Sequence, residues 1–262
     1  MNDRIALADV SLRRHGRTVL DNVSMGAGVG QVMGIIGPNG AGKSTALRVM
    51  AGLLSPEKGE VLLDGEALDA RSAEERARTI GYLEQSAEVH WPLSARAVVE
   101  LGRLPFRQGW FGSDPDGARL VDKAMNEADV RPFERRLLSE LSGGEAMRVL
   151  IARVLASEPD VILADEPVAA LDINHQLQVM ELLSERARNG VTVVIVLHDL
   201  ALAARFCDRL VLMNSGSVVR SGESEYVLEP QLLENVYNVQ MRLVEPEEGV
   251  CVPIPWQRRN RP

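Results

Sequence analysis

The sequence predicts an α/β protein with a mostly parallel sheet, an antiparallel β portion and an inserted helical subdomain. Two runs, 161–164 and 191–197, are almost continuously apolar, which is typical of parallel strands covered on both faces. A glycine-rich loop over 37–45 separates an apolar run from a helix-compatible run, as in phosphate-binding strand–loop–helix units. From about residue 86 to 155, helical periodicity replaces the strand-like runs. We therefore expect a nucleotide-binding core interrupted by helices.

Composition narrows the class of protein and of partner. Of the 262 residues, 45% are hydrophobic and 25% charged, as in globular proteins with a large core. The most apolar stretch is far shorter than the roughly 20 residues that a bilayer span needs, and the N-terminus lacks a signal-peptide pattern. Cys207 and Cys251 have no metal or disulfide spacing, which favours a reducing cytosol. The net charge of −8 argues against nucleic acid as a partner.

The N-terminal part is expected to fold as short strands around one helix. Apolar positions alternate in the strand-like runs, and Asp64-Gly65 favours the tight turn of a hairpin. Ser72 and Glu75 form a capping box, which marks the start of a short helix. The expected strands are 4–12, 18–25, 32–36, 60–63 and 79–83, and the expected helices are 44–51 and 72–78.

The remaining chain continues with helices and then alternates again between strand and helix. The expected helices of the insert are 94–104, 115–128, 132–138 and 143–156. A helix over 173–187 should join the two buried strands, and 210–213 should pair with 218–220. We expect one domain, made of a core (1–85 and 159–225), the helical subdomain (86–158) and a C-terminal extension (226–262).

The glycine-rich loop has the spacing of a P-loop: Gly37, four residues, then Gly42-Lys43-Ser44. Its glycines let backbone N–H groups converge on one anion at the start of a helix. Lys43 would reach the β- and γ-phosphates of a nucleoside triphosphate, and Ser44 would offer its hydroxyl to Mg²⁺. The alternative is an ordinary glycine-rich turn. The expected binding residues of this P-loop NTPase core are Gly37, Pro38, Asn39, Gly40, Ala41, Gly42, Lys43, Ser44 and Thr45.

Two carboxylates, Asp165 and Glu166, follow the buried run 161–164. In open α/β sheets, ligands bind at the carboxyl ends of the strands. Beside a P-loop, one acid can hold Mg²⁺ while the other faces the attacking water. We assign Asp165 to the metal and Glu166 to the general base. The alternative is that both are surface acids at a strand end.

A second glycine-containing segment stands at the start of a strongly helical run. It consists of Ser142, Gly143, Gly144 and Glu145. Ser142 can cap the helix, and the glycines let an anion approach the backbone N–H groups. From these residues alone, a plain N-cap is the better explanation, and a second phosphate-binding helix start is the alternative.

Taken in chain order, these motifs resemble those of the ATP-binding-cassette (ABC) ATPases. Residues 141–145 are similar to the family's signature motif, and Gln85, Asp172 and His198 match its Q-loop, D-loop and switch residues. The resemblance implies a head-to-tail homodimer in which each ATP lies between the P-loop of one copy and Ser142, Gly143, Gly144 and Glu145 of the other. It also implies that Lys43, Glu166 and His198 are catalytic, that Gln85 and Asp172 contribute to the nucleotide site, and that Ser44, Gln85 and Asp165 hold Mg²⁺.

A narrower resemblance is to the ATPases of ferric-siderophore, haem and cobalamin importers. Residues 98–105 contain their Leu-Gly-Arg-x-Pro segment, and residues 232–239 are similar to their tail. The resemblance implies a peripheral subunit at the cytoplasmic face of the inner membrane. It would energise polytopic permease subunits that are served by an extracytoplasmic substrate-binding protein. Those partners, rather than this chain, would select the transported iron chelate or cobalamin.

Alternatives and departures from the family also follow from the sequence. The alternative function is a soluble ABC ATPase that acts in translation, on DNA or in cofactor assembly; a P-loop kinase or GTPase would leave 141–145 unexplained. At the place of the family's adenine-stacking aromatic, the chain has Arg14 or His15. Permease contacts are expected near Gln85, in segments 86–96 and 106–111, although their aromatics could instead pack the insert. Those aromatic side chains include His90, Trp91, Trp110 and Phe111.

Overall fold

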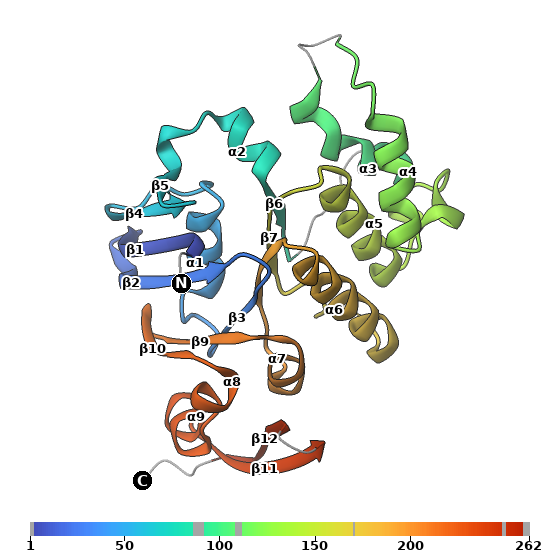
Figure 1. The fold of residues 1–262 in the computed structure, drawn as a ribbon. Coiled ribbons are helices and arrows are strands. Elements are labelled where there is room, and N and C mark those ends of the chain that lie inside the picture. Colours follow the sequence, from blue (N-terminus) through green and yellow to red (C-terminus); the bar gives the residue numbers. More distant parts are fainter. Residues whose placement is uncertain (1–2, 86–91, 108–111, 170, 248–249, 259–262) are drawn as a thin grey trace.

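The computed structural model describes residues 3–85, 92–107, 112–169, 171–247 and 250–258. Within these ranges the chain forms a large central sheet, a smaller antiparallel sheet and a C-terminal hairpin, with helices around them (Figure 1). The expected α/β class is confirmed. None of the helices in the described ranges is long and apolar enough to cross a membrane.

The central sheet has the strand order β10-β9-β3-β8-β7-β6. All neighbouring pairs are parallel except β9 and β10, which form an antiparallel edge. The strands are β3 (Val32–Ile36), β6 (Ile80–Leu83), β7 (Val161–Asp165), β8 (Thr192–Val196), β9 (Arg209–Asn214) and β10 (Ser217–Gly222). Every residue of β3, β7 and β8 is buried, which explains their nearly uniform apolar sequence.

The middle strand β3 separates two hydrophobic cores. Val32 and Ile36 pack into the core formed with the helices of the insert and with α6 and α7. Met33 and Ile35 point the other way, into the core shared with the antiparallel sheet and α1. Side chains alternate between the faces of a strand, so one five-residue strand anchors both layers.

The smaller sheet has the order β2-β1-β4-β5 and covers α1 (Lys43–Met50) on one side of the central sheet. Its strands are β1 (Asp3–Arg14), β2 (Arg17–Gly28), β4 (Lys58–Leu63) and β5 (Glu66–Ala67). The hairpin turn expected at Asp64-Gly65 lies between β4 and β5. After the short turn η1 (Leu68–Ala70), α2 (Ala73–Thr79) begins with the expected capping box of Ser72 and Glu75.

The helices of the insert gather beside the β6 and β7 end of the central sheet, and α6 and α7 continue the same layer (Figure 1). The helices of the insert are α3 (Ala95–Glu100), η2 (Leu101–Phe106), α4 (Gly117–Glu127) and α5 (Gly143–Ala156). The two helices that follow the insert are α6 (Ile173–Arg188) and α7 (Leu200–Phe206). The prediction for α5 matches residue for residue. The helix expected over 94–104 is α-helical only to Glu100 and then becomes a 3₁₀ helix.

The prediction of a helix over 132–138 is wrong. Two short 3₁₀ turns, η3 (Arg131–Phe133) and η4 (Leu138–Glu140), occupy this stretch instead. The backbone here pairs with another segment: the Leu138 N–H donates to Leu93 at 2.9 Å, and Arg136 accepts from the Ala95 N–H at 2.8 Å. These non-local bonds replace the helical ones that local periodicity suggested.

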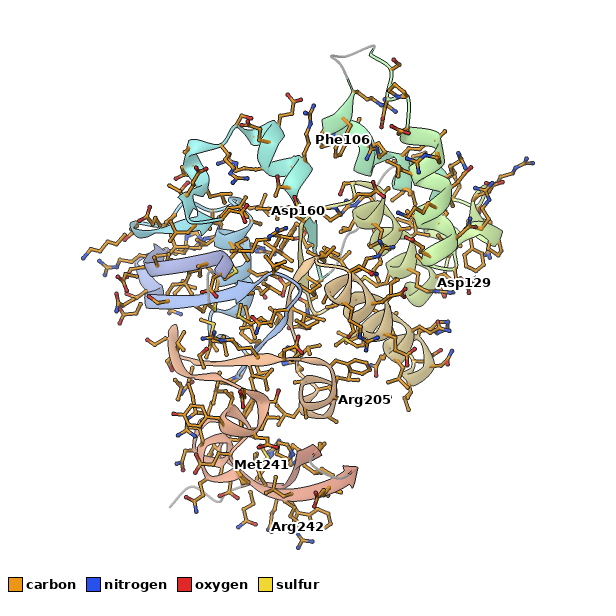
Figure 2. The ribbon with its side chains drawn as sticks, in the orientation of Figure 1. Phe106, Asp129, Asp160, Arg205, Met241 and Arg242 are labelled. Carbon is orange, nitrogen blue, oxygen red and sulfur yellow. The ribbon has the colours of Figure 1, made fainter. Side chains whose placement is uncertain are left out.

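The C-terminal part contains two strands that were not expected. After α8 (Ser224–Val227) and α9 (Pro230–Tyr237), the hairpin of β11 (Val239–Glu247) and β12 (Val250–Arg258) lies at the end of the molecule opposite α3 and α4 (Figure 1). Met241 is buried toward the rest of the fold, whereas Arg242 points outward over the ring of Trp256 at 3.9 Å (Figure 2).

Candidate ATP-binding and hydrolysis site

The P-loop connects the end of β3 to the start of α1, as predicted. Gly37 has a φ of 146°, and a Cβ atom there would lie 2.1 Å from the carbonyl oxygen of Met213. Only glycine fits this position without moving β9. This close contact at Gly37 holds the P-loop against β9, and the P-loop leads directly into the first turn of α1.

Lys43 lies inside the loop rather than on its surface. Its side chain is almost fully buried, and its ammonium donates to the carbonyl oxygens of Gly37 at 2.8 Å and Pro38 at 3.0 Å. Burial lowers the pKa of Lys43, whereas the carboxylates of Glu166 and Asp165 act in the opposite direction. The P-loop therefore combines the Lys43 ammonium group with its own backbone N–H groups at one place.

Ser44 and Asp165 meet at the ends of α1 and β7. The Ser44 hydroxyl donates to Oδ1 of Asp165 at 2.9 Å. Asp165 is 1% exposed, and its other oxygen, Oδ2, is buried without a hydrogen-bond partner. Burial raises the pKa of Asp165, and the hydrogen bond from Ser44 opposes this change.

The unpartnered Asp165 oxygen provides a test of fit for Mg²⁺. Carboxylate and hydroxyl oxygens are the ligands that this cation prefers, and a cation at Oδ2 would relieve the cost of burying the charge. In the described part of the chain, no group of three or more His, Cys, Asp or Glu side chains could hold a metal ion. A site with few protein ligands matches Mg²⁺, which keeps waters and phosphate oxygens in its shell. The residues present fit the ion.

Glu166 lies between two polar side chains from the neighbouring strand ends. Its carboxylate accepts a hydrogen bond from Nε2 of Gln85, which follows β6, and pairs with Nε2 of His198, which follows β8. The backbone of Glu166 has a φ of 50°, a left-handed conformation that is uncommon for this residue type. Such strain is typical of functional sites.

A cavity of about 410 Å³ collects the P-loop and the strand-end residues. It is lined by Val19, Asn39, Gly40, Ala41, Gly42, Lys43, Ser44, Thr45, Gln85, Glu166 and His198. All of these except Val19 were predicted. Arg14 and His15 do not line the cavity; they lie exposed at the turn between β1 and β2, where His15 has a φ of 48°.

The segment that begins at Ser142 lies outside this cavity. Its predicted N-cap is confirmed: Ser142 Oγ accepts from the Glu145 N–H at 3.3 Å, and Glu145 accepts from the Ser142 N–H at 2.8 Å. Ser142 and Gly143 are exposed, and a Cβ atom on Gly143 would meet nothing within 4 Å. Asp172 also caps a helix, by accepting from the His175 N–H at 2.9 Å. Ser142 and Asp172 are both exposed, and neither lines the P-loop cavity of its own chain.

Two residues that support the site were missed. Arg48 of α1 forms an ion pair with Glu84 at 3.0 Å, immediately before Gln85. This pair ties the segment that delivers Gln85 to the helix that follows the P-loop. The two residues are 36 positions apart, and no local pattern in the sequence announces their contact.

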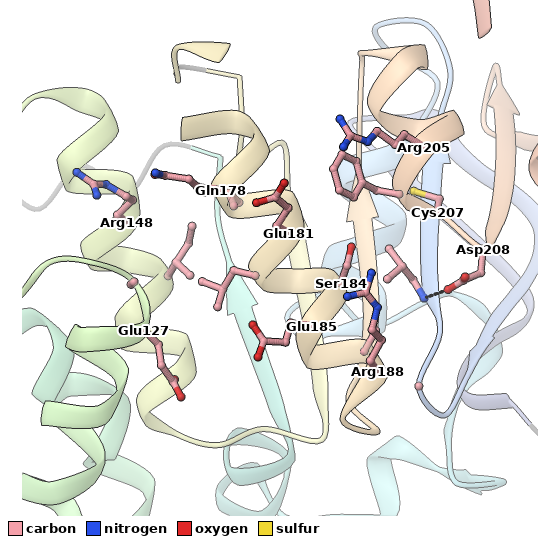
Figure 3. Close-up of a pocket in the computed structure, with 18 of the residues that line it drawn as sticks. Glu127, Arg148, Gln178, Glu181, Ser184, Glu185, Arg188, Arg205, Cys207 and Asp208 are labelled. Carbon is pink, nitrogen blue, oxygen red and sulfur yellow. Dashed lines mark hydrogen bonds between the residues drawn. The ribbon is translucent and has the colours of Figure 1, made fainter. Parts of the chain in front are cut away.

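A larger cavity of about 970 Å³ lies between α4, α5, α6 and α7 (Figure 3). It contains none of the predicted site residues, and it lies at the other end of β3, because Val32 begins that strand and the P-loop follows its end. Charges of both signs surround it, and Asp208 is already bonded to the Val32 N–H at 2.8 Å. The larger cavity therefore has no part in the predicted nucleotide chemistry, and the predicted residues that line a cavity all line the smaller one.

Several known proteins are similar to this chain. The family model described as ABC transporter matches residues 20–169. A hemin import ATP-binding protein of Nocardia farcinica is 42% identical over 91% of this chain and 83% of its own. A cobalamin import ATP-binding protein of Halobacterium salinarum is 40% identical over 94% of this chain and 62% of its own.

Solved structures agree with the family match. An ABC transporter in an inward-facing conformation superposes with a TM-score of 0.84 over 97% of this chain and 98% of that one, at 23% identity, and thus shares the fold. A dimeric ATP-binding cassette with bound ADP and phosphate is 30% identical, with a TM-score of 0.73 over 84% of this chain and 98% of its own. The chain belongs to the ABC transporter family and is one of its nucleotide-binding, ATP-hydrolysing subunits.

Proposed function

We propose that this subunit energises the import of an iron chelate, such as haem, or of cobalamin. The observation that carries the ATPase chemistry is the convergence of Gln85, Glu166 and His198 on the P-loop cavity. The import role is supported by the hemin and cobalamin import relatives, which each cover more than 90% of the chain. The alternative of a soluble ABC ATPase acting in translation, on DNA or in cofactor assembly has no such support.

In the proposed mechanism, the P-loop backbone and Lys43 bind the phosphates of ATP. Ser44, Asp165 and Gln85 would hold Mg²⁺, which neutralises charge that develops on the phosphates. Glu166 accepts the proton of the attacking water at the γ-phosphate, as general base. Gln85 and His198 orient the Glu166 carboxylate, and His198 would also lie near the γ-phosphate of bound ATP.

The proposed active form is a head-to-tail homodimer. The caps at Ser142 and Asp172 face outward, so that Ser142, Gly143, Gly144 and Glu145 are free to meet the ATP on a second copy. The dimeric cassette with bound ADP and phosphate supports this arrangement by similarity. ATP would then bind the closed dimer more tightly than separate subunits and would draw the two copies together.

The membrane partners belong to the same proposal. A subunit of this family works with polytopic permease subunits, and we place it at the cytoplasmic face of the inner membrane, with an extracytoplasmic binding protein on the other side. The permease contacts are proposed near Gln85 and in the helical insert. Of the aromatic candidates, His90, Trp91, Trp110 and Phe111 lie outside the described residues, whereas Phe106 is packed beneath two arginines.

The proposed function can be tested in vesicles. The chain is purified together with the permease encoded beside it and is reconstituted with the cognate binding protein. Uptake of haem and of cobalamin is then measured with and without ATP on the cytoplasmic side. ATP-dependent uptake of either compound, lost in Glu166→Gln, supports the proposal. ATP hydrolysis without uptake of either compound, or stimulation by nucleic acid in the absence of membrane, would favour the alternative.

A further inference from the structure

The short helix η2 is attached to the last turn of α5 by an unusually close packing contact. Gly102 lies so near α5 that a Cβ atom on it would approach the carbonyl oxygen of Arg153 to 2.0 Å. Next to it, the Arg103 guanidinium donates to the carbonyl oxygen of Ala156 at 3.0 Å. The carbonyls of a final helical turn have no partner within the helix, so Arg103 satisfies one of them.

Arg103 joins two further groups around η2. It is 6% exposed and makes a bidentate ion pair with Asp114, at 2.7 and 3.2 Å. Its guanidinium lies over the ring of Phe106 at 3.8 Å. A different arginine ties η2 to α2: Arg78 donates to the carbonyl oxygen of Pro105 at 2.8 Å. Arg103 therefore links η2 to the end of α5 and to Asp114, which lies in the segment that leads into α4.

The helix bonded to Arg103 is α5, which begins at the exposed cap residue Ser142. α5 is 14 residues long, or about 21 Å, and runs from the Ser142 cap to Ala156. Most of its residues are buried, so it moves as a rigid element. Near its end, Arg153 donates to the carbonyl oxygen of Tyr82 at 3.3 Å, on the strand that leads to Gln85.

We infer that Arg103 is a positioning residue that makes η2 follow any displacement of α5. The inference rests on the proposed function, because the cause of the displacement is the closing of Ser142 on the ATP of a second copy. The side chains that Arg103 carries along are Leu101 and Leu104, which are 41% and 50% exposed. Nucleotide binding at one end of α5 thus reaches an exposed apolar surface at the other end, in the insert proposed to face the permease.

Lysine cannot replace arginine in this arrangement. The fork of Arg103 serves the two oxygens of Asp114 and the Ala156 carbonyl at once while its flat face covers Phe106. An ammonium group has neither the fork nor the flat face. The variant Arg103→Lys therefore keeps the charge of the residue and removes its link to α5.

The test is hydrogen exchange measured by mass spectrometry in the Glu166→Gln background, with and without ATP. ATP is expected to slow exchange of residues 101–106 at least about fivefold in the parent protein, and less than about twofold in Arg103→Lys. Exchange at residues 142–148 should slow equally in both. Arg119→Lys is the matched control, since Arg119 pairs with Asp116 on the exposed surface of the same insert, and it should behave like the parent.

The outcomes separate the inference from the proposed function. Unchanged exchange of the P-loop with ATP would mean that the nucleotide site is wrongly assigned. Protection of the P-loop and of 142–148, together with an equal effect of ATP on 101–106 in parent and Arg103→Lys, would overturn the positioning role. Asp114→Asn is the second variant, which weakens the same ion pair with a smaller change. It should also reduce the effect of ATP on 101–106, and an undiminished effect in both variants contradicts the inference.

Discussion

The hydroxyl of Ser44 donates a 2.9 Å hydrogen bond to Oδ1 of Asp165, which lies 121 residues further along the chain. The bond joins the first turn of α1 to the end of β7 and leaves Oδ2 of Asp165 buried and unpartnered. Both residues thus offer oxygen atoms at one point beside the P-loop. This contact is the physical reason for assigning the two residues to Mg²⁺.

Mg²⁺ binding is expected to weaken as the pH falls. Burial raises the pKa of Asp165, so protons compete with the cation at a higher pH than at an exposed aspartate. Because the folded pKa lies above the unfolded value, this carboxyl lowers the stability of the metal-free protein as pH rises through that window. The variant Asp165→Asn cannot ionise at this position, so the free energy of unfolding of the metal-free protein should no longer fall with rising pH in that window. The expected difference is on the order of 1 kcal/mol. Calorimetric Mg²⁺ titrations with bound ATP and urea unfolding of the metal-free protein, each across pH, check these expectations.

Replacing Glu166, the proposed general base, should separate ATP binding from hydrolysis. Glu166→Gln keeps a hydrogen-bonding side chain between Gln85 and His198 but cannot accept the proton. The steady-state rate should fall at least about 100-fold, while ATP affinity stays within a few-fold of the parent. Glu185→Gln, an exposed change on α6, is the control. A hydrolysis rate near that of the parent in purified Glu166→Gln would show that another group accepts the proton.

A site shared between two copies predicts complementation. Lys43→Ala and Ser142→Ala subunits should each be inactive alone, but a mixed dimer holds one intact pair of Lys43 and Ser142. Equal mixing should restore about a quarter of the parent rate, because half of the dimers are mixed and each has one site of two. ATPase assays of the mixture measure this.

A separate variant controls for the loss of a helix cap in Ser142→Ala. Ser72→Ala removes the same kind of capping box at α2, at a cost of about 1 kcal/mol of stability, and should leave hydrolysis unchanged. No recovery in the mixture, with both variants folded and dimeric, would mean that Ser142 does not complete the site of a second copy.

The ion pair in the insert predicts a pH-dependent stability. The guanidinium of Arg103 lowers the pKa of Asp114 below its usual range. A lowered folded pKa contributes stability that is present above the unfolded value of about 3.9 and is lost as pH falls through the folded pKa. Asp114→Asn should therefore destabilise the protein at pH 7, by up to about 3 kcal/mol, and by a smaller amount at pH 3, which is below the unfolded pKa of about 3.9. Urea unfolding at both pH values measures the difference.

An exposed pair provides the comparison for Asp114. Asp116 and Arg119 are each 66% exposed, and pairs of this kind contribute about 0–1 kcal/mol. Asp116→Asn should therefore have little effect at either pH. An equally small effect of Asp114→Asn at pH 7 would contradict a stabilising role of the buried pair.

The central sheet and α5 could be predicted closely because their signals are local. β7 and β8 are buried on both faces, so nearly every residue is apolar, and α5 starts with a capping box. The P-loop and Glu166 were predicted for the same reason, because each follows a buried strand directly, whereas Gln85 and His198 were predicted from the resemblance to the ABC ATPases. The meeting of Gln85, Glu166 and His198 then follows from three parallel strands ending at one edge.

Other features depend on contacts between distant residues. The stretch 132–138 bonds to the backbone around Leu93, and Arg48 pairs with Glu84; neither contact leaves a periodic pattern. The C-terminal hairpin was not predicted, and its strand β12 contains Pro253 and Pro255, which are unusual within a strand. In a two-stranded sheet both strands are edges, where proline is tolerated.

The strand β3 lies between two cores, and this has a mechanical consequence. A displacement of the P-loop along the sheet would pull Val32 and Ile36 out of one core and Met33 and Ile35 out of the other. The P-loop is therefore expected to keep its position relative to the central sheet when a nucleotide binds. If two copies close on ATP as proposed, the resulting movement is expected in the parts of the chain that do not pack into both cores.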